Sequence, residues 1–111
     1  MNHRFLSFLG LVRKSGKIAI GADAAAEAMK KNEACLLILS GELSEKSAEN
    51  ARFLAGRKNI EVISVPFGFS EIGQAIGKKA GILAVSDRNM ARKLIEIHSE
   101  TNAEKQGGYA I

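Results

Sequence analysis

Four short apolar segments alternate with stretches of helical pattern along this chain of 111 residues. Cys35–Ser40 and Ile60–Val65 are the longer two, while Lys17–Ile20 and Ile82–Val85 are brief. Strands that alternate with helices pack as a sheet between layers of helices. The alternation therefore predicts an α/β protein, a single-domain three-layer α-β-α sandwich with a mixed four-stranded sheet.

Five helices are expected around these strands, over residues 2–14, 22–31, 45–57, 70–79 and 88–98. In the first helix the apolar side chains recur at helical spacing and are Phe5, Leu6, Phe8, Leu9 and Val12. In the third helix the residues expected to face the core are Ala48, Ala51, Phe53 and Leu54. Ser44 and Ser70 are the expected caps of the third and fourth helices. The domain then covers residues 1–98, and the polar, glycine-containing residues 99–111 are expected to form a flexible C-terminal tail.

All of the net charge lies in the first 31 residues. Six basic side chains stand there against two acidic ones, which gives +4, and the rest of the chain holds ten of each. Around these charges, Lys17–Ile20 predicts a strand and Gly21 opens an alanine-rich helix. A helix start offers free N–H groups and a partial positive charge, so basic residues near it favour an anion site. Nucleic acid is the leading candidate anion, and a solvated basic face without a partner is the alternative.

Other kinds of site find little support. Cys35 is the single cysteine, which excludes an internal disulfide, and it opens an apolar run, so a core thiol is expected. His3 and His98 lack ligand-spaced companions for a metal. Neither a dinucleotide fingerprint nor a P-loop is present. Asp23 and Glu27 lie one helical turn apart, and exposed charges are expected there rather than acid–base catalysts. The absence of a membrane span or a signal peptide predicts a cytoplasmic protein.

Two aromatic residues flank a glycine in the loop Pro66–Phe69, which follows the third strand. Aromatic side chains in a loop need a partner, because exposed apolar surface is unfavourable. Two interpretations stay open. The rings fill the core, or they form an apolar surface against an RNA base.

Three segments resemble one known family. They are the run Arg-Lys-Ser-Gly-Lys-Ile-Ala-Ile-Gly-Ala-Asp over residues 13–23, the apolar strand near residue 36, and Ile76–Gly81 before the last strand. They resemble the ribosomal protein L7Ae/L30e superfamily over about residues 4–97, and most of all its small bacterial YlxQ-like members. The resemblance implies an α-β-α sandwich that binds kink-turn or related internal-loop RNA.

The resemblance also implies roles for individual residues. Gly21 would open the RNA-binding helix, Lys17 would contact a phosphate, and Asp23 stands where the family has an asparagine that reads sheared G–A pairs. Ala24 and Glu27 replace a glutamate and a lysine of the family motif. In the family, the loop after the third strand covers a flipped nucleotide with apolar side chains.

The expected function is that of a non-enzymatic RNA-binding protein that recognises structured RNA, with the ribosome as a candidate partner and without cofactor, metal or membrane. A protein-interaction module on the same fold is the alternative, favoured by Ala24 and Glu27, and a small α/β enzyme is a third. Lys78 and Lys79 are further candidates for phosphate contacts. The predicted RNA-binding residues are Arg13, Lys14, Lys17, Gly21, Ala22, Asp23, Lys30, Lys31, Val65, Pro66, Phe67 and Phe69.

Overall fold

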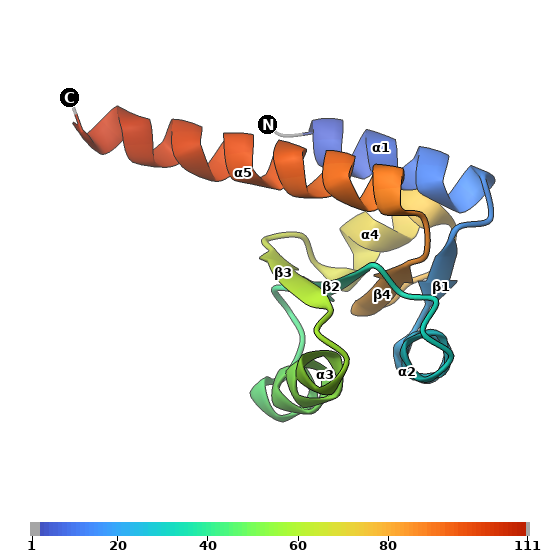
Figure 1. The fold of residues 1–111 in the computed structure, drawn as a ribbon. Helices are drawn as coiled ribbons and strands as arrows, with labels where there is room; N and C mark the ends of the chain where they lie inside the picture. The colour runs from blue at the N-terminus through green and yellow to red at the C-terminus, as the bar shows by residue number, and fades with distance from the viewer. Residues whose placement is uncertain (1–2, 111) are drawn as a thin grey trace.

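The computed structural model describes residues 3–110, with side chains over residues 4–100. Helices and strands alternate in the predicted order (Figure 1). The elements are α1 His3–Lys14, β1 Ile18–Ile20, α2 Ala22–Lys30, β2 Leu36–Ser40, α3 Glu45–Arg57, β3 Glu61–Val65, α4 Phe69–Ile76, β4 Ile82–Val85 and α5 Arg88–Ala110.

The four strands form one mixed sheet in the order β1-β4-β2-β3. β4 is antiparallel to both of its neighbours, and Leu83 lies opposite Ile20 on one side and Ile38 on the other. β2 and β3 are parallel, with Ile38 opposite Ile63. Because β1 and β2 both oppose β4, β1, β2 and β3 run in the same direction and end at the same edge of the sheet.

Alternate residues of β2 point to two separate cores, as expected for a strand that is covered on both faces. Leu36 and Ile38 pack against α1, α4 and α5, whereas Leu37 and Leu39 pack against α2 and α3. Figure 1 shows α1, α4 and α5 on one side of the sheet and α2 and α3 on the other. The three-layer α-β-α sandwich predicted from the sequence is therefore confirmed.

The predicted apolar face of α1 is confirmed, since Phe5, Leu9 and Val12 are fully buried. Phe5 stacks on Phe67 with 5.9 Å between ring centroids, and Phe5 and His98 form an edge contact with 6.4 Å between ring centroids. Burial holds the pKa of His98 below its ordinary value, because the imidazolium loses hydration. The contact joins α1, the loop after β3 and α5 on one face of the sheet.

The predicted inward face of α3 is confirmed for Ala48 and Ala51 and is wrong for Phe53 and Leu54. Phe53 is 66% exposed and Leu54 is 40% exposed, whereas Ala51 and Ala55 are buried against the sheet. Small alanine side chains let the helix lie close to the strands, and this rotates the two larger residues outward. The predicted apolar stripe was therefore displaced around the helix.

Two helices, α4 and α5, also differ from the prediction in their boundaries. α4 begins at Phe69, with Gly68 rather than Ser70 at its N-cap, and it ends at Ile76 because Gly77 adopts φ +84°. A glycine in the left-handed region terminates a helix readily.

α5 continues to Ala110, well beyond the predicted end at residue 98, and no proline interrupts this stretch. The division of residues 99–111 from the domain as a flexible tail stays a prediction.

No helix in the described range 3–110 is long and apolar enough to cross a membrane.

Gly81, at the start of β4, should not tolerate a larger side chain. An added Cβ atom would lie 2.5 Å from Phe69 Cε1 and 3.0 Å from Leu43 Cδ1. We expect Gly81→Ala to lower the free energy of unfolding by about 1–3 kcal/mol in a urea titration, since the close-packed neighbours must shift.

The matched control is Gly56→Ala in α3, where an added Cβ atom meets nothing within 4 Å. This change should raise stability by roughly 0.5–1 kcal/mol, because alanine is the better helix former. Equal effects of the two substitutions would contradict the packing described at Gly81.

Candidate nucleic-acid interface

The carboxyl ends of β1, β2 and β3 meet at one edge of the sheet, which we call the carboxyl edge; the opposite end is the amino edge. Hydrogen bonds tie the carboxyl edge together. The Gly21 N–H donates to the Ile82 carbonyl at 2.8 Å, and the Ser40 N–H donates to the Gly81 carbonyl at 2.9 Å. The Ser40 hydroxyl donates to the Phe67 carbonyl at 2.7 Å. The start of α2 and the loop after β3, both predicted to bind RNA, therefore belong to the same edge.

Three helices begin at the carboxyl edge, and side chains cap two of them. Ser44 caps α3, because its hydroxyl accepts a hydrogen bond from the Ser47 N–H at 3.2 Å. At α4, the Glu42 carboxylate accepts from the Phe69 N–H at 2.9 Å and the Glu71 carboxylate accepts from the Gly68 N–H at 2.9 Å. These acceptors already occupy the positions that an incoming anion would need.

The start of α2 differs from the other two. Its N-cap is Gly21, which makes no side-chain capping hydrogen bond and adopts φ +100° and ψ 163°. Only glycine adopts this conformation without strain. Ala22, Asp23 and Ala24 follow as exposed residues of the first turn. An α-helix leaves its first N–H groups without internal partners, so this turn presents donors to solvent, together with the Asp23 carboxylate as an acceptor.

The end of β3 and the residues that follow it divide their apolar side chains between core and surface. Val65 is 2% exposed, and Phe67 is half-buried with its ring on Phe5. The prediction that these two side chains pack on a base does not fit this burial, because both rest in the core below. Pro66 is exposed, and Phe69 is half-buried above Gly81. Pro66 is therefore the exposed apolar side chain of this loop, and Phe69, the first residue of α4, is accessible in part.

The predicted basic residues do not join this group. Lys17 precedes β1 at the amino edge, where its carbonyl accepts from the Ser86 N–H at 2.9 Å. Lys30 is the last residue of α2 and Lys31 follows it, and the nine residues of that helix span about 14 Å. Arg13 and Lys14 end α1, directly before the turn into Lys17. All five side chains are exposed. The predicted site therefore divides into two groups, with the start of α2 and the loop after β3 at the carboxyl edge and these basic residues at the amino edge.

Sequence reasoning did not single out Glu42 as a residue of this region. Its hydrogen-bond partner, the Phe69 N–H, lies 27 positions away along the chain. A local capping motif could mark Glu71, three residues after Gly68, but no local pattern marks a cap supplied by a distant loop. Over the described residues, no group of three or more histidine, cysteine or acidic side chains could hold a metal ion.

Comparison with known proteins gives two findings. The sequence model of the Ribosomal protein L7Ae/L30e/S12e/Gadd45 family matches residues 4–95. A solved structure, described as that of a protein with unknown function from Bacillus halodurans, is similar with a TM-score of 0.80 and 26% sequence identity. That similarity covers 85% of this chain and 95% of the other. A search of curated proteins found no match.

The cap at α4 gives a direct test of the carboxyl edge. We expect Glu42→Ala to lower the free energy of unfolding by about 1 kcal/mol, because the Phe69 N–H loses its acceptor. Glu42→Gln is the control, since its amide oxygen still accepts this hydrogen bond, and it should retain most of the stability. A urea titration of both variants measures this, and equal losses would show that the cap is not the source of the effect.

Proposed function

Because the chain belongs to the Ribosomal protein L7Ae/L30e/S12e/Gadd45 family, whose members generally bind kink-turn RNA and are typically not catalytic, we propose that it is a non-enzymatic RNA-binding protein. Its target is a structured RNA with a kink-turn or a related internal loop. We further propose that it is one of the YlxQ-like members, that it acts in the cytoplasm, and that ribosomal RNA is its first candidate partner.

The uncapped start of α2 is the observation that carries this proposal. It is the one helix start of three at the carboxyl edge that makes no side-chain capping hydrogen bond, in the part of the chain that the structure describes. Exposed N–H groups and one carboxylate form a mixed surface of donors and an acceptor. Base edges of an internal loop present the complementary groups, and the Asp23 carboxylate can accept from guanine N–H donors.

The loop after β3 supplies the apolar part of this surface. The exposed Pro66 and the partly accessible Phe69 would cover an unstacked base, while Val65 and Phe67 hold the loop from below. Ser40 fixes the loop through its hydrogen bond to the Phe67 carbonyl. A rigid loop loses little conformational freedom when RNA binds, which favours affinity.

The basic residues of the amino edge would contact the RNA backbone away from the internal loop. Arg13, Lys14 and Lys17 lie close together in sequence around the turn after α1, and Lys30 and Lys31 lie at the end of α2. Phosphate contacts of this kind fix the position of an RNA but carry no sequence information. In this proposal, affinity and specificity therefore come from opposite edges of the sheet.

The alternative, a protein-interaction module, predicted an exposed apolar patch at Phe67 and Phe69. Both residues are half-buried, and the large apolar side chains exposed among the described residues are Leu11, Phe53 and Leu54. The loop after β3 therefore lacks the feature that would have favoured this alternative.

We expect the protein to bind a kink-turn RNA at least about tenfold more tightly than a plain duplex of equal length at 0.15 M salt, because a duplex offers no unpaired base edges. The double variant Lys14→Glu, Lys17→Glu should weaken binding to both RNAs and reduce the slope of log affinity against log salt by about 2, near 0.9 per lost phosphate contact. Fluorescence anisotropy at several salt concentrations measures both quantities.

The control for this variant is Arg88→Glu with Arg92→Glu, two exposed residues of α5. It changes the net charge equally and should leave the preference for the kink-turn in place. Equal affinity of the unmodified protein for the two RNAs would overturn the proposed function. If the α5 control weakened binding as strongly, the phosphate contacts assigned to Lys14 and Lys17 would be wrong.

Restoring the residues of the family motif should strengthen recognition. We expect Asp23→Asn, Ala24→Glu and Glu27→Lys together to raise kink-turn affinity about tenfold, since base hydrogen bonds and a phosphate contact are added. Glu96→Lys in α5 adds the same +2 charge and is the control. A gain no larger than that of the control would show that the start of α2 does not meet the bases.

A further inference from the structure

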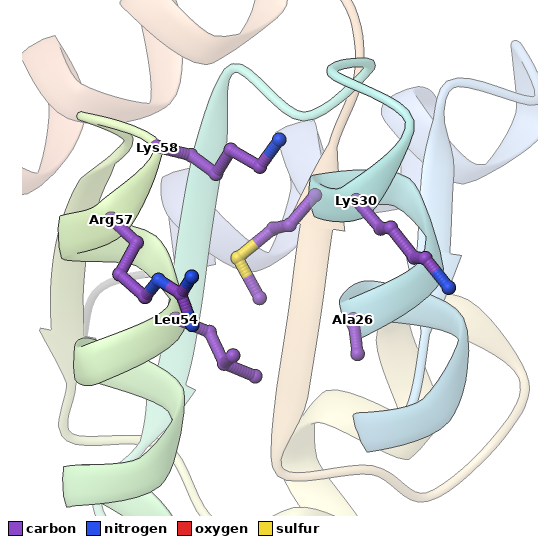
Figure 2. Close-up of a pocket in the computed structure, with 6 residues that line it drawn as sticks. Ala26, Lys30, Leu54, Arg57 and Lys58 are labelled. Atoms are coloured by element: carbon purple, nitrogen blue, oxygen red, sulfur yellow. The ribbon is translucent and has the colours of Figure 1, made fainter.

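A groove separates α2 from α3 on the face of the sheet that these two helices cover. Its wider part has a volume of about 540 Å³ and is lined by Ala26, Met29, Lys30, Leu54, Arg57 and Lys58. These residues come from the C-terminal halves of both helices (Figure 2). None of the residues assigned to the carboxyl edge lines this wider part, and Lys30 is its one lining residue that the proposed function assigns to the amino edge.

The rim of the groove is positively charged. Lys30, Arg57 and Lys58 are exposed, and no carboxylate is among the residues that line the groove. Figure 2 shows Lys58 and Arg57 reaching from α3 toward the space between the helices, whereas Lys30 lies on the outer side of α2. Within residues 4–100, Lys30 and Arg57 form no ion pair, and Lys58 donates to the Asn32 side chain at 3.1 Å. These cations are therefore available to an anionic partner.

An exposed aromatic ring lies beside this charge. Phe53 is 66% exposed, and the Arg57 guanidinium lies 5.8 Å from the centre of its ring. An aromatic face next to an arginine is the arrangement on which proteins stack unpaired bases, independently of base identity. Phe53 lies outside the hydrophobic core, and a contact with an RNA base would account for its exposed position on α3.

The groove also leads toward the carboxyl edge. Its narrower part is lined by Ala22 at the start of α2, by Ser47 and Asn50 of α3, and, like the wider part, by Met29 and Leu54. It carries no carboxylate either, and its hydroxyl and amide side chains can hydrogen-bond to sugars and bases. The two parts adjoin at Met29 and Leu54, and together they lie between the first turn of α2 and the basic ends of both helices.

We propose that this groove holds a single-stranded extension of the RNA, with phosphates at Arg57 and Lys58 and a base stacked on Phe53, which lies beside the groove next to Arg57. The inference rests on the proposed function, since the strand belongs to an RNA whose folded part lies at the carboxyl edge. The absence of lining carboxylates suits either anionic partner, whereas the position of the two parts between the first turn of α2 and the ends of both helices, and the exposed ring beside an arginine, favour RNA over an acidic protein helix. Such a helix would use the charge and the apolar floor but not the narrower part at the start of α2.

The test compares a blunt kink-turn RNA with the same RNA carrying ten unpaired uridines at its 5′ or 3′ end. With the unmodified protein, one of the two extensions should raise affinity about tenfold at 0.15 M salt. Arg57→Glu with Lys58→Glu should abolish this gain and leave affinity for the blunt RNA within about twofold. Phe53→Ala should reduce the gain to about threefold.

Circular dichroism establishes that each variant is folded, and Arg88→Glu with Arg92→Glu is the charge-matched control that should keep the gain.

Three results would overturn the inference: no gain from either extension, a gain that survives Arg57→Glu with Lys58→Glu, or an equal loss in the α5 control. The inference would also be overturned if a synthetic acidic amphipathic peptide saturated the groove while neither RNA extension raised affinity. That result would assign the groove to a protein partner. The same uridine extensions on a plain duplex separate the two proposals. If the protein binds the blunt kink-turn no better than the duplex, yet the extension still gives a gain that depends on Arg57 and Lys58, the proposed function fails and the groove stands.

Discussion

The position of β4 between β1 and β2 is the constraint on which the rest of the structure depends. Residues of β4 hydrogen-bond on both sides, and Leu83 lies opposite Ile20 and Ile38 at once. Because β4 runs against both neighbours, the outer strand β1 is forced into the direction of β2 and β3. Three helices then begin at one edge of the sheet, and the ends of α2 and α3 bring basic residues toward the other. The division into two groups of candidate RNA-binding residues follows from this one choice of strand order.

The three helix starts at the carboxyl edge differ in their capping because different residues precede them. A serine caps α3, and two glutamates, one from a distant loop, cap α4. Gly21 offers α2 neither a side chain nor an alternative acceptor, and its positive φ directs the chain into the helix at an angle that other residues resist. A helix start without a side-chain cap keeps backbone N–H groups that can still donate, and we propose that RNA accepts these hydrogen bonds.

The sequence predicted the layers well, because apolar runs and helical spacing are local patterns that burial enforces directly. It could not predict which large side chains of α3 stay outside, since that depends on how closely Ala51 and Ala55 approach the sheet. It treated residues 13–31 as one basic site, although α2 separates Lys30 and Lys31 from Gly21 by the length of a helix. The sequence also could not identify Glu42, because its role depends on a partner that the fold brings near. The same holds for Arg57 and Lys58 at the groove.

The central claim is that RNA contacts the first turn of α2. The most direct measurement is a titration of the isotope-labelled protein with a kink-turn RNA, followed through the backbone amide signals in NMR spectra. We expect the amide signals of Ala22, Asp23 and Ala24 to shift most, together with those of the loop from Pro66 to Phe69. Unchanged signals at these positions, with shifts confined to the amino edge or to α5, would contradict it.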